Sequence, residues 1–251
     1  PCRAELRGYV HNGIVDKIRA AGGEVYAITS EPQRLADSAR ADWQLNFESV
    51  GDPHHEIANA CRERGWLELI VNTKTELMES SEGACFRHPK GYFQPGVLAL
   101  DNTGRVLYRW RGVPTRKNMG GATERPTANH VYAQLSQALT TPGAEKPADA
   151  ELDLQPALDM RGIPWPIFVS ILTANGWFIK PKTFAHLPDG PSIKRRFLGA
   201  ALRIPLFIGA WALALTFLPT VWVGIAFAGW LLWLTPHVRY INDQFQNVEN
   251  P

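Results

Sequence analysis

Cysteine is scarce in this sequence, with three residues in a chain of 251, at positions 2, 61 and 85. An odd number of cysteines without regular spacing excludes the framework of a small disulfide-rich secreted module. The cysteines therefore indicate a reducing compartment or thiols that take part in catalysis.

The sequence also lacks an excess of charge, because 26 Lys and Arg stand against 24 Asp and Glu, a formal net charge of +2. Without interleaved basic and aromatic residues, so small an excess argues against a nucleic-acid partner. Charge is wholly absent from residues 204–235, whereas residues 1–140 are mixed and balanced. This contrast predicts a soluble domain, a linker and a membrane segment.

The most informative cysteine lies at the start of the chain. Apolar residues recur at helical spacing from Leu6 to Ile18, and Gly22 and Gly23 end the pattern, so Cys2 is predicted to begin a helix. The unpaired N–H groups and positive dipole of a first turn stabilise a thiolate, which makes the thiol reactive. The alternative is a buried cysteine with no redox role.

Helical and strand patterns alternate over the first part of the chain. Strands are predicted over residues 24–29 and 45–50, and helices over residues 33–43 and from Asp52 or Pro53 to Gly65. Residues 67–71 suit either a strand or a continued helix. The alternation is typical of an α/β domain with crossover connections.

A long polar loop over residues 74–91 leads into a predicted antiparallel hairpin. Its strands are residues 96–100 and 105–111, joined by the turn Asp101–Gly104. After another loop, Pro126 starts a last helix with an apolar face.

Four segments carry a family resemblance: Pro1–Leu6 (PCRAEL), Gln94–Val97 (QPGV), Leu100–Trp110 (LDNTGRVLYRW) and Asn118–Pro126 (NMGGATERP). In this order they resemble the redox helix, the cis-proline strand, the following hairpin and the loop before the last helix of alkyl hydroperoxide reductase/thiol-specific antioxidant (AhpC/TSA) proteins, in their peroxiredoxin-like branch. The resemblance covers about residues 1–140. It implies a thioredoxin-like α/β fold whose N-terminal strand is missing.

The resemblance also implies site residues. Cys2 would be the second, resolving thiol of a Cys-x-Pro-Cys motif, and Pro95 would be a cis-proline facing it. The attacking cysteine would lie three residues before Cys2, outside this sequence, which also lacks an initiator Met. The chain is therefore expected to be a fragment or a processed form, and a fragment without the attacking cysteine is expected to be inactive.

Smaller signals concern other thiols and cations. Cys85 could be a further resolving thiol or an exposed bystander, and Cys61 fits a core position. Arg125 could stabilise a thiolate or a peroxide oxygen by its charge. The His and Cys residues have no convincing zinc-site spacing, so no metal is expected.

The C-terminal part is predicted to associate with a membrane. Residues 141–203 form a linker with interfacial aromatic and basic segments, and the basic residues before position 204 favour anionic headgroups. Residues 204–235 suit either one tilted span or, because Pro219 interrupts them, a hairpin with arms of about 15 residues. Residues 236–251 form a polar tail. The positive-inside rule places the redox domain on the cytoplasmic or equivalent face.

The expected function is that of a membrane-tethered thiol-dependent antioxidant oxidoreductase that reduces peroxides or disulfides. Its partners would be the lipid bilayer and an external thiol reductant such as thioredoxin or glutathione, with no bound cofactor. The alternative is a non-catalytic thioredoxin-fold binding module at a membrane.

Overall fold

The computed structural model describes residues 2–74, 88, 90–140, 149–184 and 190–245. These residues form two units, and each is described by itself. The first contains residues 2–73, 88, 90–140 and 149–162, and the second contains Lys74 and residues 163–184 and 190–245. The first is mixed α/β and the second is almost wholly helical, which confirms the predicted fold class at this level. The thioredoxin-like arrangement stays a prediction.

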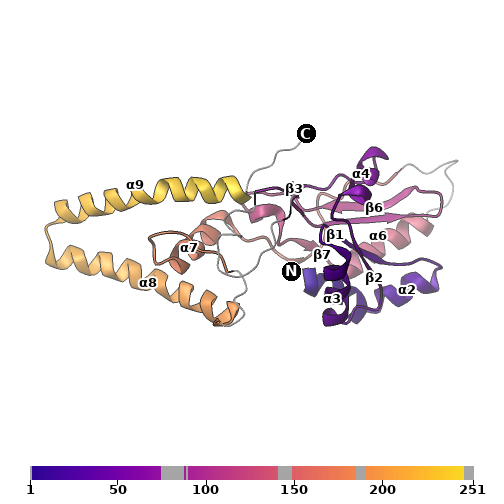
Figure 1. Cartoon of the computed structure of the whole chain (residues 1–251), viewed down its shortest axis with the longest axis horizontal. Coiled ribbons are helices and arrows are strands. Elements are labelled where there is room, and N and C mark those ends of the chain that lie inside the picture. Colours follow the sequence, from indigo (N-terminus) through magenta and orange to yellow (C-terminus); the bar gives the residue numbers. More distant parts are fainter. Residues whose placement is uncertain (1, 75–87, 89, 141–148, 185–189, 246–251) are drawn as a thin grey trace. The chain divides into compact units, whose positions relative to one another are not determined.

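The helices of the first unit follow the apolar patterns of the sequence (Figure 1). They are α1 (Cys2–His11), α2 (Ile14–Ala20), α3 (Gln33–Trp43), α4 (Glu56–Glu63) and α6 (Ala128–Thr140), with a short 3₁₀ turn, η1 (Met119–Gly121). The single helix predicted from Leu6 to Ile18 is wrong in one respect. It is divided at Gly13, whose φ of 64° lies in the left-handed region that glycine adopts without strain.

The strands of the first unit form four two-stranded ladders. They are β1 (Tyr26–Thr29) with β2 (Glu48–Gly51), β3 (Val71–Asn72) with β4 (Tyr92–Phe93), β5 (Gly96–Leu100) with β6 (Val106–Arg111), and β7 (Arg125–Pro126) with β8 (Leu158–Met160). The first pair is parallel and the other three are antiparallel. A parallel pair joined through α3 is the crossover connection that the sequence predicted.

The predicted hairpin of β5 and β6 is confirmed, and Asp101 holds its turn. One carboxylate oxygen of Asp101 accepts hydrogen bonds from the backbone N–H groups of Thr103 and Arg105, at 2.8 and 3.0 Å. The other oxygen accepts from the Arg105 Nε at 3.0 Å. These bonds let Gly104 take a φ of 85° and bring the two strands into register.

The core of the first unit lies between its helices and β6. Tyr9 of α1, Ile14 and Val15 of α2, and Val131 of α6 are buried in one cluster with Trp110 of β6. Burial of this face fixes α1 against α6, so the N-terminal end of α1 is held in place by packing rather than by propensity alone.

Residues 149–160, expected to belong to the linker, are hydrogen-bonded into the first unit. The N–H groups of Ala150 and Asp153 donate to the carbonyls of Val106 and Arg109 at 2.9 Å each, along the edge of β6. Asp153 also accepts from the Tyr108 hydroxyl at 3.0 Å and lies 2.8 Å from the His130 Nε2. The segment thus covers an edge that would otherwise be unpaired.

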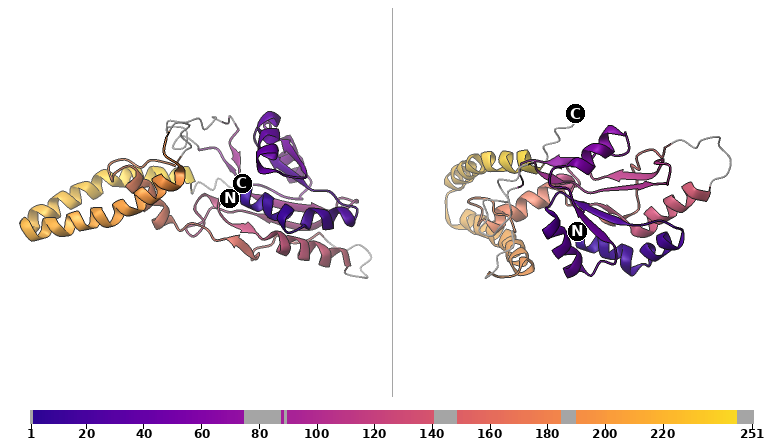
Figure 2. Two further views of the ribbon diagram at one scale, coloured as in Figure 1. Left: turned by 90° about the horizontal axis from the view of Figure 1, so that it is seen from below. Right: turned by 45° about the vertical axis from the view of Figure 1, so that its right-hand side comes forward.

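The second unit contains α7 (Trp165–Asn175), α8 (Ile193–Phe217) and α9 (Thr220–Phe245). Figures 1 and 2 show α8 and α9 as two arms joined at one end. The helices meet at Leu218 and Pro219, so the hairpin alternative is the one observed. Its arms are longer than expected because α8 begins in the basic flank and α9 continues into the tail.

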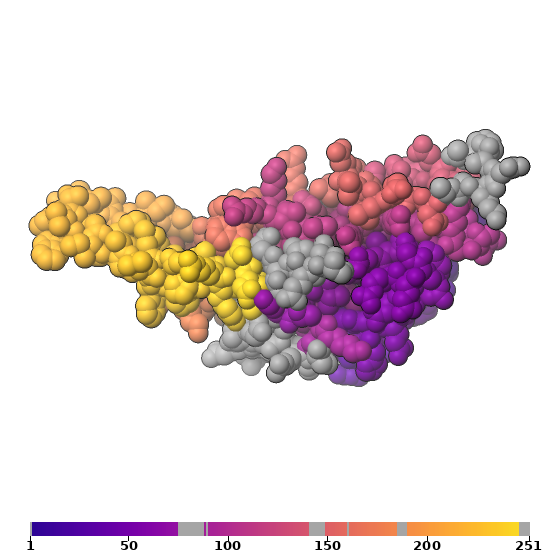
Figure 3. All heavy atoms as spheres, turned by 90° about the horizontal axis from the view of Figure 1, so that it is seen from above, coloured from indigo at the N-terminus to yellow at the C-terminus, as the bar shows by residue number. Residues whose placement is uncertain are grey.

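Both arms are long and apolar enough to cross a membrane by length and composition. Only 6% of the most apolar window of each arm is buried within the protein. The space-filling view shows the orange and yellow atoms of the two arms at the surface (Figure 3). Exposed apolar area on this scale is a feature of surfaces that meet lipid or another protein.

Candidate functional site

Cys2 is the first residue of α1, as predicted, and its side chain is exposed and not part of a disulfide. Glu5 lies in the first turn of α1, where an acidic residue suits the helix dipole, and Leu6, Tyr9 and Val10 pack toward the core. The thiol is therefore both accessible to a substrate and placed at a helix N-terminus.

Arg125 lies beside Cys2, although 123 positions separate them. Its side chain is only 2% exposed, and its Nη2 lies 3.5 Å from the Cys2 sulfur. The Nη1 donates to the carbonyl of Glu124 at 2.7 Å, and the Nε lies 2.7 Å from a carboxylate oxygen of Glu5. The guanidinium thus touches the thiol and is held by two oxygens that fix its orientation.

Glu5 and Tyr9 complete the cluster on one face of α1. Burial raises the pKa of Glu5 above its ordinary value, and the positive charge of Arg125 opposes this rise. Burial and then the charge of Glu5 raise the pKa of Tyr9. The spacing of Cys2, Glu5 and Tyr9 by three and four positions puts their side chains side by side on the helix.

Arg125 is positioned by the loop that precedes it, and Asn118 organises that loop. Asn118 is fully buried, and its amide nitrogen donates to a Glu124 carboxylate oxygen at 3.0 Å. Gly162 packs against the same turn so closely that a Cβ there would lie 2.5 Å from the Lys117 carbonyl oxygen. The segment Asn118–Pro126, noted in the sequence, is therefore a rigid support for Arg125.

The expectation for Pro95 is wrong in its geometry. No cis peptide bond occurs among the residues that the structure describes, so the bond before Pro95 is trans. The Pro95 carbonyl accepts a hydrogen bond from the N–H of Gly112 at 2.7 Å, and its ring packs closely on the same glycine. Pro95 therefore joins the end of β6 to the start of β5, which a trans bond achieves without strain.

Cys61, the other cysteine that the structure describes, does not join this cluster. Cys61 lies on α4 at intermediate exposure, and burial raises the pKa of its thiol despite the opposing charge of Arg64. A thiol with a raised pKa is a poor nucleophile at neutral pH. Cys85 lies outside the described residues.

Histidines gather at a second place, between α4 and β4. The rings of His55 and His88 stack with centroids 5.7 Å apart, and His55 also contacts the Phe93 ring at 4.6 Å. Burial lowers the pKa of His55, whose backbone adopts a left-handed φ of 61°. Among the described residues, no three His, Cys, Asp or Glu side chains are grouped as metal ligands would be.

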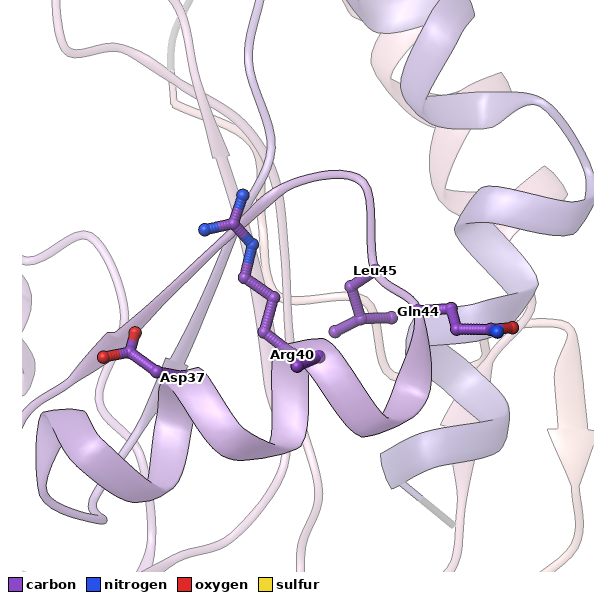
Figure 4. A pocket seen from close by; sticks show the side chains of 5 residues that line it. Asp37, Arg40, Gln44 and Leu45 are labelled. Atoms are coloured by element: carbon purple, nitrogen blue, oxygen red, sulfur yellow. The ribbon is translucent and has the colours of Figure 1, made fainter.

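A shallow depression lies along α3, with a volume of about 440 Å³ (Figure 4). Asp37, Arg40, Gln44 and Leu45 line it, together with Ala41. Arg40 is engaged with Glu48 through an ion pair of 2.7 Å. The depression holds neither a thiol nor a buried charge, so it offers no chemistry comparable with that at Cys2.

Sequence reasoning found Cys2 and Arg125 but assigned no role to Glu5, Tyr9 or Asn118. The spacing of Glu5 and Tyr9 from Cys2 was a usable signal, since all three share a helical face. Asn118 was part of a recognised segment, but nothing in its neighbours indicated complete burial.

Comparisons of the chain with protein-family models, with curated proteins and with solved structures found no match.

Proposed function

We propose that Cys2 takes part in thiol-disulfide chemistry that reduces peroxides or disulfides, in a protein that the second unit holds in a membrane. One observation carries the proposal: an exposed thiol at a helix N-terminus lies 3.5 Å from a buried guanidinium. Burying a guanidinium is costly unless it is paired. Glu5 and the Glu124 carbonyl pair the Nε and the Nη1, so it is the direction of the Nη2 toward a thiol that needs a reason.

A thiolate at Cys2 would supply that reason. The Nη2 lies where it can donate to a sulfur anion, while Glu5 neutralises Arg125 whenever Cys2 is uncharged. The same arginine therefore has a partner in each state of the thiol. Such a pair suits a cysteine that cycles between thiolate and disulfide.

In the proposed cycle, the thiolate of the attacking cysteine that the AhpC/TSA resemblance implies, three residues before Cys2, first breaks the O–O bond of a peroxide. Its sulfur is oxidised to a sulfenic acid and the peroxide is reduced to an alcohol. The Cys2 thiolate then attacks that sulfur, an S–S bond forms, and the oxygen leaves as water after taking up a proton. An external dithiol, such as thioredoxin, or two glutathione molecules supply the two electrons that reduce the disulfide.

With a disulfide substrate, the first step gives a mixed disulfide in place of the sulfenic acid. The Cys2 thiolate displaces the substrate thiol from it, and the remaining steps are unchanged. Cys2 is the resolving thiol in both cases.

The apolar arms α8 and α9 support the membrane part of the proposal, since their length matches a bilayer and few of their side chains are buried. A tether of this kind would bring the thiol near the peroxides of membrane lipids.

The test is a thiol titration of the full-length protein before and after an alkyl hydroperoxide or a small disulfide is added. We expect two thiols to be lost and an added dithiol to restore them. In a Cys2→Ser variant, a trapped sulfenic acid or mixed disulfide should accumulate, whereas the Cys61→Ser control should behave as the parent. If the protein reduces disulfides but not hydroperoxides, the proposed peroxidase activity is wrong. An unchanged thiol count with both substrates would favour the non-catalytic binding module.

A further inference from the structure

The loop of residues 176–183, which follows α7, is bonded to α9. The indole N–H of Trp230 donates to the carbonyl of Phe178 at 2.8 Å, and that of Trp233 donates to the carbonyl of Ile179 at 2.9 Å. These carbonyls belong to irregular backbone. Irregular backbone is tolerated next to hydrocarbon only when its polar groups have partners, and the two indoles supply them.

Arg203 of α8 is hydrogen-bonded to the end of α7, immediately before the same loop. The guanidinium donates to the carbonyls of Ala174 and Asn175, at 3.2 and 3.1 Å, at the C-terminal end of α7. It also lies 4.1 Å above the ring of Trp177. A cation at a helix C-terminus is favourable, so Arg203 and α7 stabilise each other.

Arg203 on α8 and Trp233 on α9 lie at about the same distance from the turn that joins the two arms. From Arg203 to Phe217 the rise of an α-helix gives about 21 Å, and from Thr220 to Trp233 it gives about 20 Å. Between these levels the arms carry no charged residue. These lengths are shorter than a hydrocarbon core of about 30 Å. Long basic side chains can extend outward along the helix, so that their charged ends reach the headgroups.

The charge at the base of the arms is almost all positive. The described residues of the second unit include eight Lys and Arg against one acidic residue, Asp243, which forms an ion pair of 2.8 Å with Lys74. The exposed cations at this base, here called the basic collar, come from the loop after α7, from α8 and from α9; they are Lys180, Lys182, Lys194, Arg195 and Arg239.

We propose that the basic collar binds the headgroups of anionic phospholipids, with Trp177 and Trp233 at headgroup depth. Both tryptophans are more than half exposed, at 65% and 57%. Trp233 donates its indole N–H to the loop, and the face of the Trp177 ring lies against Arg203. Anionic phospholipid is the partner that matches all three features at once: an uncharged apolar surface, a tryptophan border and a ring of cations.

The proposal rests on the membrane insertion proposed above and is independent of the chemistry at Cys2. For the test, the full-length protein is inserted into vesicles of equal parts phosphatidylglycerol and phosphatidylcholine, extracted in mild detergent, and the lipid that stays bound is analysed. We expect an excess of phosphatidylglycerol on the order of fivefold, which high salt abolishes.

A variant with Lys180→Gln, Lys182→Gln, Lys194→Gln and Arg195→Gln should bring this ratio close to one. The matched control removes four exposed cations of the first unit, through Arg34→Gln, Arg62→Gln, Arg116→Gln and Lys117→Gln, and should leave the ratio unchanged. Equal retention of the two lipids by the parent, or an undiminished excess in the collar variant, would overturn the proposal.

Two further outcomes separate the sources of failure. If millimolar inorganic phosphate alone abolishes the excess, the collar takes a free anion rather than a lipid, and the proposal fails. If the parent protein does not stay with the vesicles at all, membrane insertion itself fails, whereas insertion with equal lipid retention refutes the collar only.

Discussion

Two charged side chains lie close to the Cys2 thiol. Arg125 is buried and touches the sulfur of Cys2. It also forms an ion pair with Glu5, which lies one turn after Cys2 on α1. Because Glu5 has its pKa raised by burial, the folded chain binds its proton more tightly than the unfolded chain. The tighter proton binding by Glu5 stabilises the folded chain. The stabilisation is complete below about pH 4 and is lost as the pH rises through the pKa of Glu5 in the folded chain.

Replacing Arg125 with Gln should slow the alkylation of Cys2 by iodoacetamide at neutral pH. The expected loss is roughly three- to tenfold, the size of one charge interaction close to a protein surface. Mass spectrometry of the Cys2 peptide over time gives the rate. Arg125→Lys should retain part of the parent's alkylation rate, and the control Arg116→Gln should retain all of it. Circular dichroism checks that each variant is folded. Equal alkylation rates for Arg125→Gln and the parent would show that Arg125 does not affect the reactivity of the thiol.

His55 makes the first unit sensitive to mild acid. Since burial holds its pKa below the ordinary value, the unfolded chain takes up a proton at a higher pH than the folded chain. Its contribution to stability is therefore complete above about pH 6.5 and declines as the pH falls below that value.

A His55→Asn variant should lose less stability than the parent between neutral pH and about pH 5, because asparagine also tolerates the left-handed backbone and does not titrate. Urea unfolding at a series of pH values, followed by the fluorescence of the first unit, measures the difference. The neighbouring His54 is exposed, so His54→Asn serves as the control and should follow the parent. Parallel curves for His55→Asn and the parent would contradict the prediction.

At the scale of elements, α7 and its loop join the two long arms. An aromatic cluster continues this junction, with Phe178 stacked on Phe207 at 3.9 Å and Trp211 against Phe227 at 5.1 Å. The two indole hydrogen bonds link α9 to the loop after α7 at the base of the arms, and the contact of Trp211 with Phe227 links α8 to α9 about halfway along them. The arms are thereby fixed at both ends.

Trp230→Phe should destabilise the second unit by about 1 kcal/mol, because the ring contacts are kept while the hydrogen bond to the Phe178 carbonyl is lost. Thermal unfolding of the full-length protein in detergent micelles measures the change. Trp222→Phe is the matched control, since that side chain is 66% exposed and should have little effect. If both variants unfold at the parent temperature, the indole bond contributes nothing.

At the scale of the whole molecule, the chain separates an α/β unit with the thiol from a helical unit with the apolar arms. The backbone of residues 150–153 is bonded along β6, so the first unit extends through β8 before the second begins. Each unit has its own core.

A chain ended after Gly162 should therefore fold and remain in the aqueous phase, whereas the full chain should stay with membranes after a sodium carbonate wash. The truncated chain has lost both long apolar helices and keeps the core of the first unit. Fractionation followed by immunoblotting measures the distribution. A full chain released by carbonate would show that its arms do not cross or enter the bilayer.

Local patterns were sufficient for some elements. The helix predicted over residues 33–43 is observed with the same bounds because Pro32 precedes it and Gln44, in a left-handed conformation, ends it. The helix predicted from Asp52 or Pro53 begins later, at Glu56, because Asp52 lies before the first turn and its carboxylate accepts the N–H groups of Glu56 and Ala58. A sequence pattern does not distinguish a residue before the first turn from the first helical residue when both are polar.

Contacts between distant segments were beyond local patterns. The proximity of Arg125 to Cys2 was reached only through a family resemblance, and the Glu5 ion pair was not foreseen, since its two members are 120 positions apart. The strand predicted from Leu45 begins at Glu48, because Leu45 and Phe47 are taken up by the core instead of a ladder. In each case tertiary packing decided what local preference left open.

The turn between α8 and α9 bears on how the arms enter a bilayer. Between Leu213 and Val221 its polar side chains are those of two threonines, Thr216 and Thr220. A charged residue at this place would have to be carried through hydrocarbon, at a cost of about 3 kcal/mol for each Lys, Arg or Asp. An uncharged turn avoids that cost, which is consistent with arms that enter hydrocarbon turn first.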